Sequence, residues 1–329
     1  MEVWIFAAYL LVAAAVVICS IKCADYVDLL DKKTRISGAF IGGVILAAVT
    51  SLPELVTSIS SVTVVQNPGL VIGNVLGSNI FNLCIFGGLV VCTLRRFSRS
   101  RVAKSHLATL ICTAAAFIGC GFAIFTGFGN IPVVNINVIS VLILVVYIIS
   151  LRYLSAEESG ETEASESPLT VKQIIWRFSL TAIGLVGASI LITVLTDRIA
   201  AMLSLEASLA GALFLGIATS LPELTSSIAL VRKGNYNAMI GNVVGSNMFN
   251  FTILSVCDLL SRGENLYVGS AQTVSMLVFG VISTLLVGVV LFCKQRQGKS
   301  LPKRARFAMY ALPALLTLVS YLSFLMVSM

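Results

Sequence analysis

Long apolar segments separated by short polar ones make up almost the whole chain of 329 residues. Because about 20 apolar residues are needed for a helix to cross a bilayer core, the pattern predicts ten membrane spans. They lie near residues 4–21, 36–64, 69–93, 105–126, 131–151, 174–196, 207–231, 236–260, 268–293 and 307–328. The second, third, seventh and eighth spans contain Pro, Gly, Asn and Ser where lipid-facing helices carry Leu and Val. We therefore expect an all-α membrane protein with broken helices at its core.

The polar residues of these irregular spans form a motif that occurs twice. The hexapeptide TSLPEL occupies 50–55 and again 219–224, and the pattern GNVxGSNxFN occupies 73–82 and again 241–250. Each predicted half has five spans, an odd number, so the second copy would enter the membrane in the opposite sense. Interrupted helices at matching positions of inverted repeats indicate a transporter with a midplane binding site. We predict two inverted five-helix repeats, 1–154 and 174–329, joined by an acidic cytoplasmic linker, 155–173.

Composition and charge agree with a membrane location. The chain is 57% hydrophobic and 11% charged, with a mean hydropathy of +0.99, whereas soluble domains carry about a quarter charged residues. Of the 22 basic residues, 20 follow odd-numbered predicted spans, and only Arg198 and Arg262 follow even-numbered ones. This bias predicts a multi-pass cell-membrane protein with both termini extracytoplasmic. The net charge of +7 is therefore a topology signal and does not indicate nucleic-acid binding.

Three further features have simple interpretations. The first span lacks a basic n-region and a small-residue cleavage site, so we interpret it as a retained span rather than a signal peptide. The linker contains five glutamates but lacks the ligand spacing and turn glycine of a calcium-sensing loop, so we expect a flexible connection. The eight cysteines show no paired spacing in loops and are interpreted as packing residues.

Among the 15 acidic residues, we place Glu54 and Glu223 alone near mid-membrane. A charge at that depth costs at least about 2.5–3.5 kcal/mol, and no Lys or Arg falls mid-span to pair with either glutamate. The partner must then be a metal ion or a proton. Oxygen ligands beside two carboxylates suit Ca²⁺ and Na⁺ better than Zn²⁺ or copper.

Neutral oxygens accompany both glutamates along the sequence. The candidates are Thr50, Ser51, Ser78 and Asn82 in the first half and Thr219, Ser220, Ser246 and Asn250 in the second. Their alternative role is hydrogen bonding between helices. The prolines that precede the glutamates disfavour helical geometry, so we expect local unwinding that frees main-chain carbonyls. The S-x-x-E spacing also predicts that Ser51 and Ser220 cap the helices that begin there.

The two motifs resemble the α-repeats of the cation/calcium exchangers, and the prokaryotic sodium/calcium exchangers most closely. The resemblance implies a diamond of ion sites around Glu54 and Glu223. It adds main-chain oxygens of Thr50 and Thr219 for Ca²⁺, and for Na⁺ it adds Ser51, Ser78, Ser220, Ser246 and the carbonyls of Ala47 and Gly216. Asn82 and Asn250 would face the centre. The family often has a glycine where this chain has Val49 and Ala218, and its potassium-dependent members carry Asp at the position of Asn250.

From these features we predict a secondary antiporter that exchanges Na⁺ for Ca²⁺ by alternating access. It would not be an enzyme, would need no cofactor besides the transported ions, and shows no sign of an obligatory protein partner. The resemblance implies that the spans at 4–21 and 174–196 form a sliding gate. The main alternative is a Ca²⁺/H⁺ antiporter on the same scaffold. An intramembrane hydrolase would gain nothing from the repeated Ser–Asn block, and a channel would conduct without a counter-ion.

Overall fold

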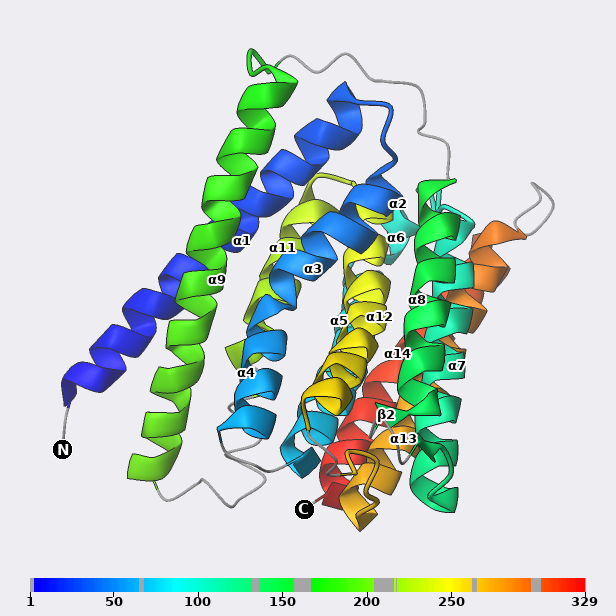
Figure 1. The fold of residues 1–329 in the computed structure, drawn as a ribbon. Coiled ribbons are helices and arrows are strands. Elements are labelled where there is room, and N and C mark those ends of the chain that lie inside the picture. Colours follow the sequence, from blue (N-terminus) through cyan, green and yellow to red (C-terminus); the bar gives the residue numbers. More distant parts are fainter. Residues whose placement is uncertain are drawn as a thin grey trace.

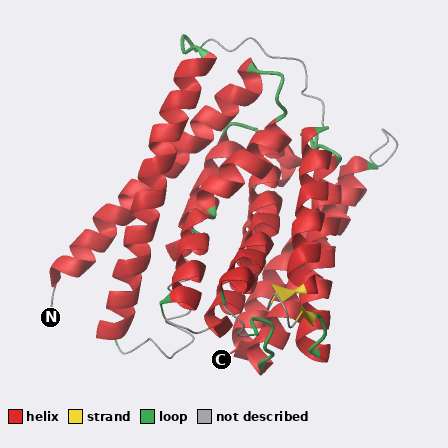
Figure 2. Ribbon diagram, in the orientation of Figure 1, coloured by secondary structure: helices red, strands yellow, loops and turns green. Residues whose placement is uncertain are grey.

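The computed structural model describes residues 3–64, 68–131, 136–156, 167–203, 216, 218–261, 265–296 and 303–328. Apart from one two-stranded ribbon, the regular structure in these ranges is helical (Figure 2). The helices are α1 (Val3–Lys33), α2 (Gly38–Phe40), the π-helix η1 (Ile41–Leu46), α3 (Ala47–Thr50), α4 (Leu52–Thr63), α5 (Pro68–Cys92), α6 (Leu94–Phe97), α7 (Ser105–Thr126), α8 (Val138–Ser155), α9 (Val171–Met202), α11 (Leu221–Arg232), α12 (Tyr236–Leu260), α13 (Ala271–Gln295) and α14 (Lys303–Ser328). The strands are β1 (Asn130–Ile131) and β2 (Ile136–Asn137).

Eight of the described helices are long and apolar enough to cross a membrane: α1, α5, α7, α8, α9, α12, α13 and α14. A ninth span is formed if Gly38–Thr50 and Leu52–Thr63, which meet at a bend of 42°, are counted together. Much of the predicted span 207–231 lies outside the described residues, as does most of the linker 155–173. Within the described ranges the structure therefore has eight or nine spans, where the sequence predicted ten.

Several helices exceed their predicted bounds. Helix α1 has 31 residues and ends at Lys33, so Lys22 and Lys32 lie within a helix and not in the predicted loop. At 1.5 Å per residue, 31 residues extend about 46 Å, well beyond a hydrocarbon core of about 30 Å, so part of α1 extends past the bilayer core. The fifth predicted span begins late, at Val138, because β1 and β2 pair as an antiparallel ribbon just before it.

Helices α1 and α9 form a pair on one side of the molecule and run in opposite directions (Figure 1). Along its length α1 also contacts α11, and α9 contacts α3 and α4. The N- and C-terminal ends of the chain lie at the same end of the molecule (Figure 1). On the other side of the molecule, α12 is the most buried of the candidate spans and contacts α5, α7, α8 and η1, while α13 and α14 pack against α5.

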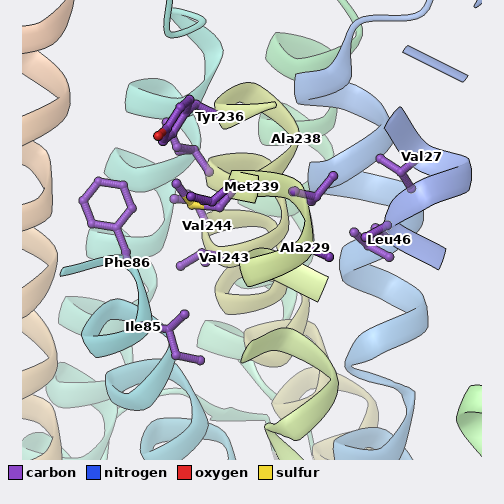
Figure 3. Close-up of a cluster of buried hydrophobic side chains, with 14 of the residues drawn as sticks. Val27, Leu46, Ile85, Phe86, Ala229, Tyr236, Ala238, Met239, Val243 and Val244 are labelled. Carbon is purple, nitrogen blue, oxygen red and sulfur yellow. The ribbon is translucent and has the colours of Figure 1, made fainter. Parts of the chain in front are cut away.

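The core around α12 combines bulky side chains with glycine contacts. Tyr236, Met239 and Val244 of α12 lie in one cluster with Phe86 of α5 (Figure 3). Where α12 faces η1, by contrast, a Cβ atom on Gly245 would overlap the main chain of the π-helix. The main chains of α12 and η1 therefore touch directly, which brings the end of α3 against α12.

Candidate functional site

Two helices at the centre of the molecule begin after a one-residue break. Ser51 (φ −94°, ψ 4°) precedes α4, and Ser220 (φ −90°, ψ 9°) precedes α11. In both helices a proline lies in the first turn, where its missing N–H interrupts the main-chain hydrogen-bond ladder. The predicted breaks are therefore present in both copies of the motif. They place Glu54 and Glu223 in the first turn of their helices, where the helix dipole favours a negative charge.

The expectation that the two serines cap these helices is wrong. Neither hydroxyl makes a capping hydrogen bond, because a capping residue normally has an extended backbone and both serines have ψ near zero. Ser51 Oγ instead donates to Glu223 Oε1 at 3.1 Å, which joins the two halves of the chain. Ser220 Oγ has no hydrogen-bond partner among the described residues.

The unwinding expected before the prolines is confined to the single break residue. The main-chain oxygen of Ala47 still accepts from Ser51 N at 3.0 Å, and that of Gly216 accepts from Ser220 N at 3.1 Å. The Ala47 oxygen also accepts from Thr50 Oγ1 at 3.3 Å, and the Gly216 oxygen accepts from Thr219 Oγ1 at 3.2 Å. A carbonyl oxygen has two lone pairs, so both can still contribute to ion binding, but neither is fully free.

The two glutamate side chains are almost completely buried, each with an exposed fraction of 1%. Neither carboxylate oxygen of Glu54 has a hydrogen-bond partner among the described residues, and Glu223 has one only on Oε1. The carboxylates are near enough to interact electrostatically. The ion pairs that the structure describes involve Asp25 and Asp28 and neither of these glutamates.

Two other buried acids, Asp28 and Asp258, have the hydrogen-bond partners that Glu54 lacks. Asp28 forms an ion pair with Lys32 at 2.9 Å and accepts from Asn235 Nδ2 at 3.1 Å. Asp258 accepts from the main-chain N–H of Asn137 at 2.7 Å and from Ser140 Oγ at 2.6 Å. The fold thus gives Asp28 and Asp258 direct hydrogen-bond partners, whereas the Glu54 carboxylate accepts no hydrogen bond from the described residues and that of Glu223 accepts one from Ser51.

Several of the predicted ligands meet across the two halves. Thr50 Oγ1 lies 3.4 Å from Ser246 Oγ, and Ser246 Oγ lies 3.5 Å from the main-chain oxygen of Ala47. Ser78, Asn82 and Asn250 are buried on α5 and α12, and both amide atoms of Asn82 lack a hydrogen-bond partner in the described part of the chain. The amide of Asn82 is therefore available to an additional ligand.

Four further asparagines belong to the same region and were not among the predicted site residues. Asn79 accepts from Asn247 Nδ2 on its main-chain oxygen at 3.1 Å and from Asn250 Nδ2 on its side chain at 3.0 Å. Asn74 and Asn242 contact the glutamate-bearing helices of their own halves. All four occur at matching positions of both motif copies, so the repeat itself was the signal that could have identified them.

The chemistry of this cluster suits a hard cation. It offers two carboxylates, hydroxyls and amide oxygens, and the described residues include no group of three or more His, Cys, Asp or Glu side chains that could hold a metal of another kind. Oxygen donors of this type bind Ca²⁺ and other hard cations. Two unpaired carboxylates provide the charge to balance one divalent ion.

Comparisons with known proteins give a consistent picture. A family model described as sodium/calcium exchanger protein matches residues 3–156 and 173–329. An uncharacterized membrane protein of Methanocaldococcus jannaschii is 29% identical over 257 residues, covering 77% of this chain and 78% of its own. The sodium/calcium exchanger MaX1 of Methanosarcina acetivorans is 40% identical over 73 residues, 21% of each chain. A solved structure of the sodium-calcium exchanger NCX_Mj has the same fold, with a TM-score of 0.73, 22% identity and 98% of each chain covered.

Proposed function

The chain belongs to the sodium/calcium exchanger family, and from this premise we propose that it is a secondary antiporter that exchanges Na⁺ for Ca²⁺ by alternating access. The observation that carries the proposal is the pair of buried glutamates at the helix breaks. In the described structure the Glu54 carboxylate accepts no hydrogen bond, although the Thr219 hydroxyl lies close enough to interact with it, and the Glu223 carboxylate accepts one from Ser51. A bound cation replaces those missing partners.

In this proposal one shared site serves both ions. Glu54 and Glu223 are the central ligands of Ca²⁺, together with main-chain oxygens of Thr50 and Thr219. The Na⁺ sites add the hydroxyls of Ser51, Ser78, Ser220 and Ser246 and the carbonyls of Ala47 and Gly216. The amides of Asn82 and Asn250 face the central site. Because both ions need the same carboxylates, each is carried while the other is absent.

The proposed architecture has ten spans in two inverted repeats, 1–154 and 174–329, with the linker 155–173 on the cytoplasmic side and both termini outside. Support comes from the similar backbone angles at Ser51 and Ser220 and from termini that lie at the same end of the molecule (Figure 1). The antiparallel pair α1 and α9 is the proposed gate. It contacts α3, α4 and α11, which surround the two helix breaks.

The wealth of hydroxyl and amide oxygens favours Na⁺ as the counter-ion, because a proton needs only the carboxylates. The decisive experiment is uptake of ⁴⁵Ca²⁺ into proteoliposomes loaded with Na⁺, with the pH gradient collapsed by an ionophore. We expect uptake that stops when internal Na⁺ is replaced by choline. The matched variant Glu54→Gln should abolish it, while Asp25→Asn, a change to an acid outside the site, should not.

Two results would overturn the proposal in different ways. Uptake that follows an imposed pH gradient and ignores Na⁺ would identify a Ca²⁺/H⁺ antiporter, for which the same two carboxylates suffice. Ca²⁺ flux that continues with no counter-ion on the opposite side would identify a channel.

A further inference from the structure

The first turn of α4 is held by an amide from the next helix. Asn74 Nδ2 of α5 lies 3.3 Å from the main-chain oxygen of Glu54 and 2.9 Å from Ser58 Oγ. A carbonyl oxygen only accepts hydrogen bonds, so the nitrogen side of this amide must face α4. A single side chain thus contacts the residue that carries the carboxylate and another residue one turn further along the same helix.

The second half of the molecule contains the same arrangement. Asn242 Nδ2 of α12 donates to Ser226 Oγ and Ser227 Oγ of α11, both at 3.1 Å. Ser226 Oγ in turn lies 3.2 Å from the main-chain oxygen of Glu223. Asn242 matches Asn74 in the sequence repeat, and Ser227 matches Ser58. Both copies of the motif therefore connect the glutamate-bearing helix to the following helix by an asparagine–serine hydrogen bond.

These amide nitrogens are poor candidates for ion ligands. An amide NH₂ group is a donor and carries no lone pair for a cation, and both nitrogens already have protein acceptors. The oxygen of Asn242 lies 3.4 Å from Thr50 Oγ1, so this side chain also reaches the broken helix of the other half. Asn74 and Asn242 are placed to act on the ion through the residues they hold.

We propose that Asn74 and Asn242 are positioning residues that fix the two glutamates at the distance a cation requires. The inference rests on the proposed function, in that Glu54 and Glu223 must bind the ion. Ca²⁺–oxygen bonds span only about 2.3–2.6 Å, so a shift of the helix start by a few tenths of an ångström changes the fit. Outer partners of metal ligands commonly contribute about 10–100-fold to affinity.

The bond to Ser58 supplies a conservative test. Ser58→Ala removes the hydroxyl that Asn74 contacts, while Ser58→Thr keeps a hydroxyl and adds one methyl group. Ser283 provides the matched control, because its hydroxyl makes a buried 3.0 Å hydrogen bond to Ser320 Oγ between α13 and α14. A purely structural role for Asn74 predicts that Asn74→Ala and Ser283→Ala behave alike.

The experiment measures the Kd of Ca²⁺ by isothermal titration on purified protein in Na⁺-free detergent, well below the Tm of each variant. We expect Asn74→Ala and Asn242→Ala to weaken binding about tenfold or more. Ser58→Ala should weaken it by a smaller factor and Ser58→Thr should restore it. In the Ser58→Ala background, Asn74→Ala should cost less than it does alone. Ser283→Ala should lower Tm and leave Kd unchanged.

A Kd within twofold of wild type in Asn74→Ala, with a loss of Tm like that of Ser283→Ala, would overturn the positioning role. If Asn74→Ala does not fold, equal Kd values for Ser58→Ala, Ser58→Thr and wild type would do the same. Glu54→Gln separates this failure from failure of the proposed function. Wild-type affinity in Glu54→Gln would refute the function itself, whereas lost binding there with normal binding in Asn74→Ala refutes only the inference.

Discussion

Replacing Glu54 by Gln should affect stability in two opposite ways, depending on Ca²⁺. The carboxylate is 1% exposed and has no hydrogen-bond partner among the described residues. Gln has almost the same shape and no charge. In the ion-free protein, the substitution therefore removes a charge whose burial at mid-membrane costs about 2.5–3.5 kcal/mol. With Ca²⁺ present, it removes a central ligand.

The expected magnitudes follow from linkage. A ligand at 100 times its Kd stabilises the folded protein by about 2.7 kcal/mol, so wild type should gain that amount with Ca²⁺ and Glu54→Gln should gain none. Ion-free Glu54→Gln should be more stable than ion-free wild type, by an amount on the order of that burial cost. This difference should shrink as the pH falls, because protonation also neutralises the wild-type carboxylate.

Thermal unfolding in detergent, with and without Ca²⁺ at one scan rate, provides the measurement. The control is Asp25→Asn, which removes an acid whose side chain is 28% exposed and pairs with Lys233 at 3.0 Å. The control should keep the full Ca²⁺-dependent shift. A Ca²⁺ shift that persists in Glu54→Gln would refute the reasoning, and so would an ion-free variant that unfolds well below ion-free wild type.

Three further substitutions test separate contacts. Ser51→Ala removes the hydrogen bond that the described structure gives the Glu223 carboxylate. Since bonds to charged groups contribute about 1.5–3 kcal/mol, Ca²⁺ titration should show at least tenfold weaker binding. Gly245→Ala forces a Cβ into the facing main chain and should lower the unfolding free energy by about 1–3 kcal/mol, whereas Gly88→Ala, with only an ordinary contact, should not. Asn235→Ala releases two aspartates of α1, so hydrogen exchange should rise at the C-terminal end of that helix while Ca²⁺ affinity stays unchanged.

Features encoded by neighbouring residues could be predicted from the sequence. Pro53 and Pro222 each lack the N–H that a continuous helix needs, so the breaks at the preceding serines are local consequences of proline. The isolation of Glu54 could also be predicted, because it follows from the absence of basic residues in the apolar spans. Helix ends were less predictable. Helix α1 continues to Lys33, beyond its apolar stretch, and a hydropathy pattern detects only the apolar part of a helix.

Features that depend on packing between distant segments could not be predicted. The π-helix η1 lies where Gly241 and Gly245 of α12 bring the two main chains into contact. Six residues are too few to show a hydrophobic period that would distinguish a π-helix from an α-helix. The same holds for Ser51, whose spacing to Glu54 is that of a capping box but whose hydroxyl binds a residue 172 positions away. The sequence repeat predicts the same role for both serines, whereas in the described structure Ser51 donates to a glutamate and Ser220 does not.

That difference bears on how the molecule works. The hexapeptides around Glu54 and Glu223 are identical, so nothing within them can distinguish the two carboxylates. Yet Ser51 donates to Glu223, while Ser220 and Glu54 have no corresponding bond in the described structure. The asymmetry must therefore arise from how the surrounding helices pack. An antiporter that opens one site to either side in turn requires such a departure from symmetry, because two halves in identical surroundings would give both sides equal access. On the proposed mechanism, the bond from Ser220 to Glu54 should form when the opposite side opens and the bond from Ser51 is released.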